Sequence, residues 1–243
     1  MTAARAMILA AGRGERMRPL TDQCPKPLLP VRGKPLIQYH VEALARAGLR
    51  DLVVNTAWLG HRIESLFAEQ AAARKIDASA SDEPPRIHYS HEGLDFGGAL
   101  ETAGGIARAL PLLGDVFWLV GGDVYVPEFE FSPAALDRFA AGGRLGHVVL
   151  VPNPPHNLKG DFSLRADGLV RRDGTPRYTY STIGMYRKDF FAALPAGNPS
   201  GIKAPMLPLL LAAIDNEQLT AEIYTGSWTD VGTPERLAQL NTT

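Results

Sequence analysis

Short apolar runs alternate with amphipathic segments along the first 150 residues of the 243-residue chain. Runs bounded by glycine, proline or polar residues predict buried strands, whereas apolar residues spaced by three and four predict helices. The run at 116–120 is apolar throughout, which is typical of a strand buried on both faces. Strands are predicted at 6–10, 51–56, 86–90, 116–120 and 147–152, and helices at 35–47, 60–73, 101–109 and 132–140.

The pattern changes after residue 152, where shorter alternating runs predict antiparallel strands. An exposed loop is expected at 74–85 and a glycine-rich turn at 93–98. The chain is therefore predicted to be α/β, with a wound, mostly parallel sheet of mixed, Rossmann-like type and a small antiparallel addition. We expect a single domain with halves 1–150 and 151–243. The later elements are predicted at 162–166, 169–172, 178–187, 205–216 (helix), 220–225 and from Pro234 (helix).

Composition restricts the possible partners. Lys plus Arg number 25 against 26 Asp plus Glu, so no overall positive field attracts the chain to nucleic acid or to an anionic membrane. Cys24 is the sole cysteine, which excludes a disulfide framework and suits a reducing cytoplasm. The apolar runs, such as 207–214, are too short to span a membrane. We expect a cytoplasmic protein without a nucleic-acid or membrane partner.

A glycine turn and a proline-rich basic loop follow the first predicted strand. The segment is not a P-loop, because no Gly-Lys-Ser/Thr follows the glycines, and Met17 stands where a dinucleotide fingerprint has its third glycine. Prolines from Pro19 to Pro30 also prevent the helix that such a fingerprint begins. Glycines that admit a phosphate, with Arg16 and Lys26 as cations, favour a phosphate-binding loop. An ordinary basic surface loop is the alternative.

Two aspartates are candidate metal ligands. Asp123 follows the apolar strand at 116–120, and ligands bind at the carboxyl ends of strands in open α/β sheets. Asp230 lies in "WTDVGTPER", ahead of a predicted helix, where a turn or helix-capping role is equally compatible with the sequence. Mg²⁺ needs one or two carboxylates besides phosphate oxygens and waters. The sequence lacks the Gly-x-Ser-x-Gly and His-Glu-x-x-His patterns, which suggests that no protein side chain acts as the nucleophile.

Four segments together resemble the sugar-1-phosphate nucleotidyltransferases: "LAAGRGERMRPLT", "PKPLLPVRGKPLI", "LVGGDV" and "WTDVGTPERL". They stand in the family's order across nearly the whole chain. Four more, "NTAWLG", "LETAGGI", "NPPHNLKGDF" and "IKAPMLPLLL", resemble the branch that transfers UMP from UTP to N-acetylmuramate 1-phosphate in bacterial peptidoglycan recycling. Family members that use glucose or mannose phosphates share the first four segments, so these sugars remain the alternative.

The resemblance implies roles for individual residues. It implies that the first half of the chain binds the nucleotide and the second the sugar phosphate. Arg16, Lys26 and Asp123 would be catalytic, Asp123 and Asp230 would bind Mg²⁺, and Asp161 would meet sugar hydroxyls. The nucleotide would contact the following residues: Leu9, Ala10, Gly12, Gly14, Glu15, Arg16, Lys26, Glu101, Thr102, Gly104 and Gly121.

Two positions depart from the pattern of the family. Gly121 replaces an asparagine of the uridylyl-transferring branch, which removes a possible contact with the nucleotide, and Thr182 replaces a glycine near the sugar pocket. Lys203 precedes a helix expected to begin near Pro205, where a cation opposes the helix dipole. Such a locally poor choice suggests a role for Lys203, or for a basic neighbour such as Arg187, in binding the sugar, although an exposed lysine without a role is as plausible.

Two other classes of protein are alternatives. A nicotinamide-dependent oxidoreductase would need an acidic residue after the second strand, where the chain has Val54-Asn55-Thr56. An inactive nucleotide-sensing homologue would have lost a metal carboxylate or the loop lysine, and both aspartates and Lys26 are present. Both classes are disfavoured.

Overall fold

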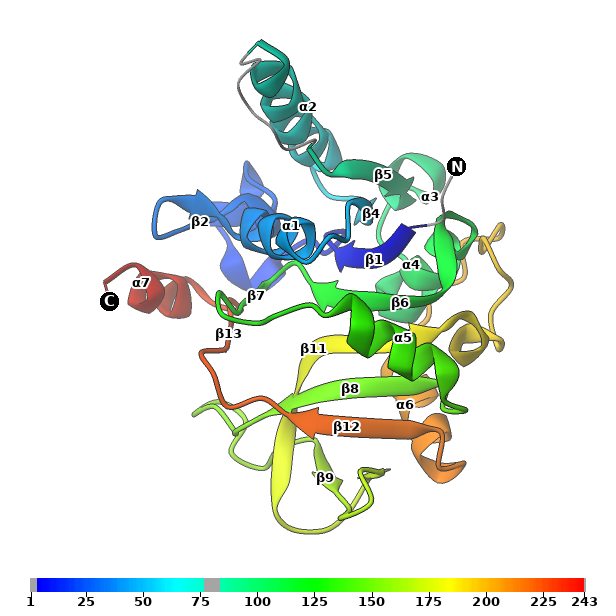
Figure 1. The fold of residues 1–243 in the computed structure, drawn as a ribbon. Coiled ribbons are helices and arrows are strands. Elements are labelled where there is room, and N and C mark those ends of the chain that lie inside the picture. Colours follow the sequence, from blue (N-terminus) through cyan, green and yellow to red (C-terminus); the bar gives the residue numbers. More distant parts are fainter. Residues whose placement is uncertain (1–3, 77–83, 243) are drawn as a thin grey trace.

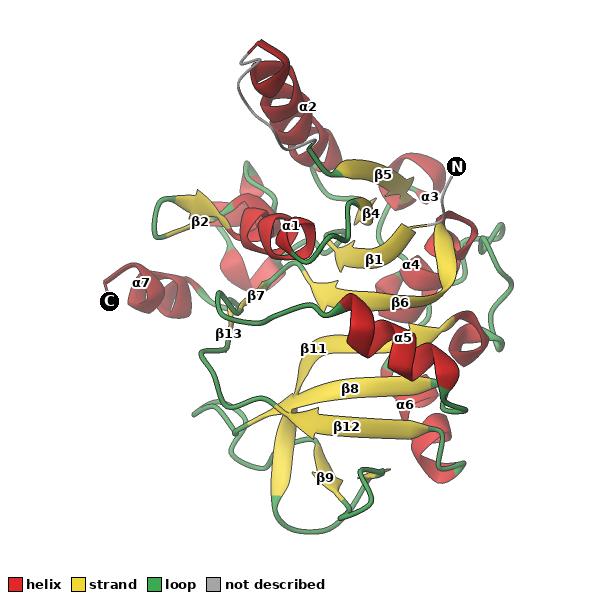
Figure 2. Cartoon of the chain, viewed as in Figure 1, coloured by secondary structure: helices red, strands yellow, loops and turns green. Residues whose placement is uncertain are grey.

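A nine-stranded mixed sheet, covered by helices on both faces, forms the centre of the computed structural model, which describes residues 4–76 and 84–242 (Figures 1 and 2). This arrangement confirms the predicted α/β class. Within the described residues, none of the helices combines the length and the hydropathy that crossing a bilayer requires.

The elements follow one another in the alternating order that the sequence predicts. The α-helices are α1 (Leu36–Arg46), α2 (Gly60–Ile76), α3 (Glu92–Phe96), α4 (Glu101–Ala109), α5 (Pro133–Ala141), α6 (Leu207–Asp215) and α7 (Pro234–Thr242). The strands are β1 (Ala4–Leu9), β2 (Pro30–Val31), β3 (Lys34–Pro35), β4 (Asp51–Thr56), β5 (Arg86–His91), β6 (Leu113–Gly121), β7 (Val124–Tyr125), β8 (Gly146–Val151), β9 (Phe162–Leu164), β10 (Val170–Arg171), β11 (Arg177–Arg187), β12 (Leu219–Ile223) and β13 (Thr229–Asp230).

The sheet combines a parallel part and an antiparallel part. Strands β6, β1, β4 and β5 are parallel neighbours, with Ala6 paired to Leu52 on one side and to Trp118 on the other. Strand β11 is antiparallel to both β6 and β8, and its first residues also pair with β9. Because β1 and β6 are parallel, their carboxyl ends meet at one edge of the sheet, on the left in Figure 1.

Alternation along the strands divides the core between the two faces. Met7 points toward the face covered by α4 and α6, where it belongs to the same apolar cluster as Leu210. Ile8, the next residue, belongs to the opposite cluster together with Ile37 of α1 and Leu136 of α5. With both faces covered, the sheet leaves its carboxyl edge as the place where polar groups can gather.

Most predicted elements are confirmed, and the differences have local causes. The expected turn at 93–98 contains the short helix α3, whose end at Gly97 has the left-handed φ of 75° that stops a helix. The helix expected from Pro205 begins at Leu207, with Pro208 in its first turn. Helix α2 runs through Ile76 into the predicted loop at 74–85, of which residues 77–83 lie outside the described part.

The proline-rich segment is more ordered than predicted. It contains three single 3₁₀ turns, at Glu15–Met17, Leu20–Asp22 and Lys26–Leu28, although the prolines were expected to exclude helical structure. Proline is tolerated in the first turn of a helix, and a 3₁₀ turn needs very few backbone hydrogen bonds. An α-helix begins only at Leu36, as the prolines require.

Candidate active site

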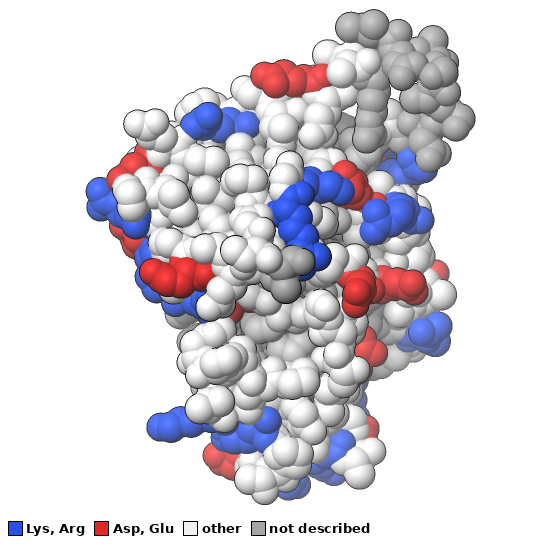
Figure 3. Space-filling view, turned by 90° about the vertical axis from the view of Figure 1, so that its left-hand side faces the viewer, with Lys and Arg blue, Asp and Glu red and all other residues white. Residues whose placement is uncertain are grey.

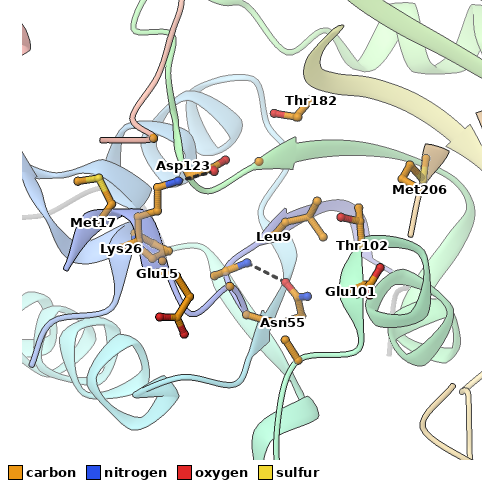
Figure 4. A pocket seen from close by; sticks show the side chains of 18 of the residues that line it. Leu9, Glu15, Met17, Lys26, Asn55, Glu101, Thr102, Asp123, Thr182 and Met206 are labelled. Carbon is orange, nitrogen blue, oxygen red and sulfur yellow. Dashed lines mark hydrogen bonds and ion pairs between the residues drawn. The ribbon is translucent and has the colours of Figure 1, made fainter. Parts of the chain in front are cut away.

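A pocket of about 460 Å³ opens at the carboxyl ends of β1 and β6 (Figure 4). The loop after β1, the start of α4 and part of β11 complete its walls, so both halves of the chain contribute. Eleven of the predicted site residues line it: Leu9, Ala10, Gly12, Gly14, Glu15, Arg16, Lys26, Glu101, Thr102, Gly121 and Asp123. The structure therefore brings together most of the residues that the sequence nominates.

The glycine loop is fixed by its own contacts. Gly14 has a left-handed φ of 68°, and a Cβ there would lie 2.9 Å from the Thr21 methyl carbon. The Thr21 hydroxyl donates to the Gly14 carbonyl at 2.8 Å, and the Trp58 indole donates to the Thr21 carbonyl at 2.8 Å. Arg13 stacks on the Trp58 ring with its guanidinium carbon 3.5 Å from the ring centroid. These contacts fix the conformation of the loop beside the pocket.

Lys26 and Asp123 form an ion pair in the pocket, with Nζ 2.7 Å from Oδ2 (Figure 4). The Lys26 side chain is 12% exposed, whereas that of Asp123 is 44% exposed. The buried stem of Lys26 holds the ammonium in place, while the carboxylate remains open to the pocket. A phosphate could compete for the lysine, and a cation could compete for the aspartate.

Backbone pairing brings the segment of Asp230 next to that of Asp123. Strand β13 pairs with β7, so that Asp230 is opposite Val124, and the Val231 amide donates to the Asp123 carbonyl at 2.8 Å. The Asp230 carboxylate contacts the Arg236 guanidinium and lies 2.9 Å from His156 Nε2. Among the described residues, no group of three or more His, Cys, Asp or Glu is arranged to hold a metal ion. A cation here would need ligands from phosphates and water.

Four predicted residues, Gly104, Asp161, Lys203 and Asp230, are not among the lining residues. Gly104 is buried in α4, where a Cβ would collide with the Ile202 carbonyl, so its lack of a side chain serves helix packing. Asp161 accepts hydrogen bonds from the Asn157 side chain and the backbone amide of Tyr180, a lining residue. Lys203 is exposed. The binding roles of these four remain predictions.

The alternative placement of Arg187 at the sugar site is wrong. Arg187 is paired with Val116, in the amino-terminal half of β6, whereas the pocket lies at the carboxyl end. Its guanidinium donates to the carbonyls of Phe139 at 3.2 Å and Ala140 at 2.6 Å, at the end of α5. Arg187 therefore caps a helix at the opposite edge of the sheet.

The structure adds pocket residues that the sequence did not nominate as ligand contacts. Asn55 and Glu92 are buried, yet both line the pocket.

Two lining residues have unusual backbone conformations: Thr182 has a left-handed φ of 62°, and Glu101 has one of 59°. Such conformations strain residues other than glycine and concentrate at functional sites. In the sequence, the unusual conformation of Thr182 was signalled by the glycine that it replaces, because glycine adopts this φ without strain.

Charge on the pocket's side of the molecule is mixed. Figure 3 shows the face to which the carboxyl ends of β1 and β6 point, with Lys and Arg interspersed among Asp and Glu. This distribution agrees with the net charge of −1. Attraction for a polyanion must therefore come from the local cations of the pocket, Arg16 and Lys26.

Comparison with known proteins decides the family. The Nucleotidyl transferase family profile matches residues 5–162. The chain belongs to the nucleotidyl transferase family. The match confirms the nucleotidyltransferase resemblance stated from the motifs.

Two relatives that match over nearly the whole of both chains are named as enzymes that transfer a nucleotide to a sugar 1-phosphate, which confirms the prediction of a sugar-1-phosphate nucleotidyltransferase. An N-acetylmuramate α-1-phosphate uridylyltransferase of Neisseria meningitidis serogroup B is 43% identical, covering 97% of this chain and 96% of its own. A protein of that name from Caulobacter vibrioides is 33% identical, covering 95% and 92%. A putative glucose-1-phosphate thymidylyltransferase structure from Bacillus anthracis superposes with a TM-score of 0.75 at 20% identity, covering 99% and 94%. Because the identity is 20%, this last similarity shows a shared fold alone.

Proposed function

We propose that this nucleotidyltransferase transfers UMP from UTP to N-acetylmuramate 1-phosphate, giving UDP-N-acetylmuramate and pyrophosphate in the cytoplasm, as a step of peptidoglycan recycling. The observation that carries the proposal is 43% identity to the Neisseria protein over 97% of this chain and 96% of that one. A pocket with two cationic side chains at the carboxyl edge of the sheet supports it.

The reaction needs alignment more than proton transfer. An oxygen of the sugar 1-phosphate attacks the α-phosphorus of UTP, and a new P–O–P linkage forms. The bond from the α-phosphorus to the bridging oxygen breaks, and pyrophosphate leaves with the electron pair. Because the attacking oxygen is already anionic, no general base is required. This agrees with a pocket whose lining contains no histidine among the described residues.

Repulsion between the two substrates is the main obstacle. Two unit charges 4 Å apart repel by about 4 kcal/mol at an effective dielectric constant of about 20. In the proposal, Arg16 and Lys26 offset this repulsion, with Lys26 between the two phosphates. The ion pair of Lys26 with Asp123, at 2.7 Å, shows that the ammonium reaches an anionic oxygen in the pocket. The backbone of Leu9, Ala10 and Gly12 would approach the nucleoside.

Two carboxylates, one in the pocket and one beside it, suit Mg²⁺ as the cofactor. Asp123, in the turn between β6 and β7, and Asp230 of β13, beside the pocket lining, would supply hard carboxylate oxygens, and Mg²⁺ commonly takes its other ligands from phosphates and water. Each carboxylate already faces a cationic side chain, Lys26 or Arg236, as expected where positive charge is accommodated. When bound, the ion would neutralise phosphate charge and stabilise the leaving group.

The sugar side of the proposal rests on Lys203 and Asp161. N-acetylmuramate carries a lactyl carboxylate, and an exposed lysine is a suitable partner for it. The Ala204 carbonyl accepts hydrogen bonds from Ala103 at 2.9 Å and Gly104 at 3.1 Å, and Met206 lines the pocket. The segment that carries Lys203 therefore runs beside the pocket wall.

The test measures pyrophosphate release from UTP, CTP, ATP, GTP and dTTP, each with N-acetylmuramate, N-acetylglucosamine, glucose and mannose 1-phosphates, with Mg²⁺ present. We expect the highest kcat/KM for UTP with N-acetylmuramate 1-phosphate. Higher efficiency with mannose or glucose 1-phosphate would refute the muramate assignment and leave the family assignment intact. Absence of release in every combination would support the inactive, nucleotide-sensing alternative.

A further inference from the structure

A buried amide and a buried carboxylate face each other behind the pocket. Asn55, the next-to-last residue of β4, is 3% exposed, and Glu92, the first residue of α3, is 0% exposed. Asn55 Nδ2 donates to Glu92 Oε1 at 2.6 Å. Burying a carboxylate is costly unless hydrogen bonds compensate, so this pair requires an explanation.

The pair connects two walls of the pocket. The Ala10 amide donates to Asn55 Oδ1 at 2.8 Å, as the dashed line to Asn55 in Figure 4 shows. At the other end, the Leu100 amide donates to Glu92 Oε2 at 2.7 Å. Ala10 opens the glycine loop, and Leu100 immediately precedes Glu101 at the start of α4. The chain of three hydrogen bonds therefore sets the distance between these two segments.

The groups at the two ends of this series of hydrogen bonds determine which side chains can lie between them. Both ends are backbone N–H donors, so each side chain must present an acceptor outward. A single donor must then lie between the two side chains, and one amide combined with one carboxylate provides it. Helix α4 packs directly on the pair, because a Cβ on Gly105 would collide with Glu92 Oε1. The arrangement leaves little space for another geometry.

We propose that Asn55 and Glu92 are positioning residues that hold the glycine loop and the start of α4 at the separation required by the nucleoside. Neither residue acts on the reacting phosphates. The assignment of this side of the pocket to the nucleoside rests on the proposed function. If the pair is disturbed, binding of the nucleotide should weaken, whereas binding of the sugar phosphate should change little.

The experiment exchanges the two functional groups. In Glu92→Gln, one hydrogen bond is lost, because Asn55 and Leu100 donate to two different oxygens of Glu92 and glutamine keeps just one of them. In Asn55→Asp, two carboxylates face each other. The double variant Asn55→Asp with Glu92→Gln restores all three hydrogen bonds with the original charge, since aspartate accepts from Ala10 and from the glutamine, which in turn accepts from Leu100.

Each single exchange should raise the KM and Kd for the nucleotide by about tenfold, because a buried polar group loses its partner. The double variant should return both to within about threefold of the unmodified chain. The KM for the sugar phosphate should stay within about twofold throughout. The matched control is Glu42→Gln, which changes another amide–carboxylate pair, with Gln38 at 3.0 Å, outside the pocket; its nucleotide KM should not change.

Assays should use whichever nucleotide and sugar phosphate the unmodified chain prefers, so that failure of the uridine or muramate assignment does not affect this test. Equal increases of both KM values, or a folded double variant that keeps the tenfold defect, would overturn the proposal. Unchanged nucleotide binding in Glu92→Gln would overturn it as well. If both single variants fail to fold, a folded double variant with nearly normal nucleotide Kd supports it.

Discussion

The two positions that depart from the family pattern, Gly121 and Thr182, are neighbours in the wall of the pocket. Gly121 ends β6, and a Cβ there would lie 2.6 Å from Thr182 Oγ1 and 2.9 Å from Asp123 Oδ1. The Thr182 side chain therefore occupies the space that a side chain at 121 would need. We predict that the two positions compensate each other, and that Gly121→Ala destabilises the chain less when Thr182 is reduced to glycine.

The magnitudes follow from this geometry. Gly121→Ala overpacks the site, at a cost of about 1–3 kcal/mol in the free energy of unfolding. Thr182→Gly relieves about 1–2 kcal/mol of left-handed strain at its φ of 62°. It also loses about 1 kcal/mol of backbone entropy and a hydroxyl bond to the Ser181 carbonyl worth about 1 kcal/mol. Its net effect should be within about 1 kcal/mol, and the double variant should be about 1–2 kcal/mol more stable than additivity predicts.

The assay is urea unfolding of the unmodified chain, both single variants and the double variant, with kcat measured on each. Gly143→Ala is the matched control, because a Cβ there meets no heavy atom within 4 Å. Its unfolding free energy should change by less than about 0.5 kcal/mol. Additivity of the two substitutions within about 0.3 kcal/mol would refute the steric coupling.

Four further predictions concern single side chains. Lys26→Ala should lower kcat/KM by more than about a hundredfold with little change in Tm, measured by pyrophosphate release and thermal unfolding, because the proposed role is in charge stabilisation. Excess chelator, or Asp123→Asn, should reduce kcat by orders of magnitude while folding is retained; undiminished turnover would contradict metal dependence. Burial lowers the pKa of His40 to about 4, against smaller opposing effects of its bond to Val124 and the charge of Asp123. Between pH 6.5 and about 4, the unfolded chain therefore binds a proton that the folded chain does not. The free energy of unfolding should decrease by up to about 1.4 kcal/mol for each unit by which the pH is lowered in this range. His40→Gln should reduce this dependence, measured by urea unfolding at pH 7 and pH 5. Lys203→Ala should raise KM for N-acetylmuramate 1-phosphate more than for UTP, and equal changes would remove Lys203 from the sugar site.

The fold was largely predictable because its central strands are buried on both faces. The apolar run at 116–120 marks β6, and the helices around it carry clear three- and four-residue spacing. The two-residue strands β7 and β13 escaped prediction, because no periodicity can develop over so short a length. Their pairing is set by tertiary contacts, such as the bond from Val231 to the Asp123 carbonyl at 2.8 Å.

The candidate site was predictable where motifs carry the chemistry. Lys26 and Asp123, which are 97 positions apart, were nominated from separate motifs and meet at 2.7 Å. Glu92 could not be nominated, because its neighbours Gly93 and Asp95 suggest a polar surface turn. Its burial follows from packing against α4, a contact that neither segment reveals in its own sequence.

Glycine-rich segments look alike in sequence whether they admit a ligand or another part of the chain, and the structure separates the two uses. Gly12 lines the pocket, and a Cβ there would meet no heavy atom within 4 Å, so its open surroundings leave room for a substrate. Gly104 and Gly105 are enclosed: a Cβ on the first collides with the Ile202 carbonyl, and one on the second with Glu92. The glycines of "ETAGGI" therefore act on the pocket indirectly. They let α4 approach Glu92 closely, and Glu92 in turn holds the backbone from which Glu101 and Thr102 face the pocket.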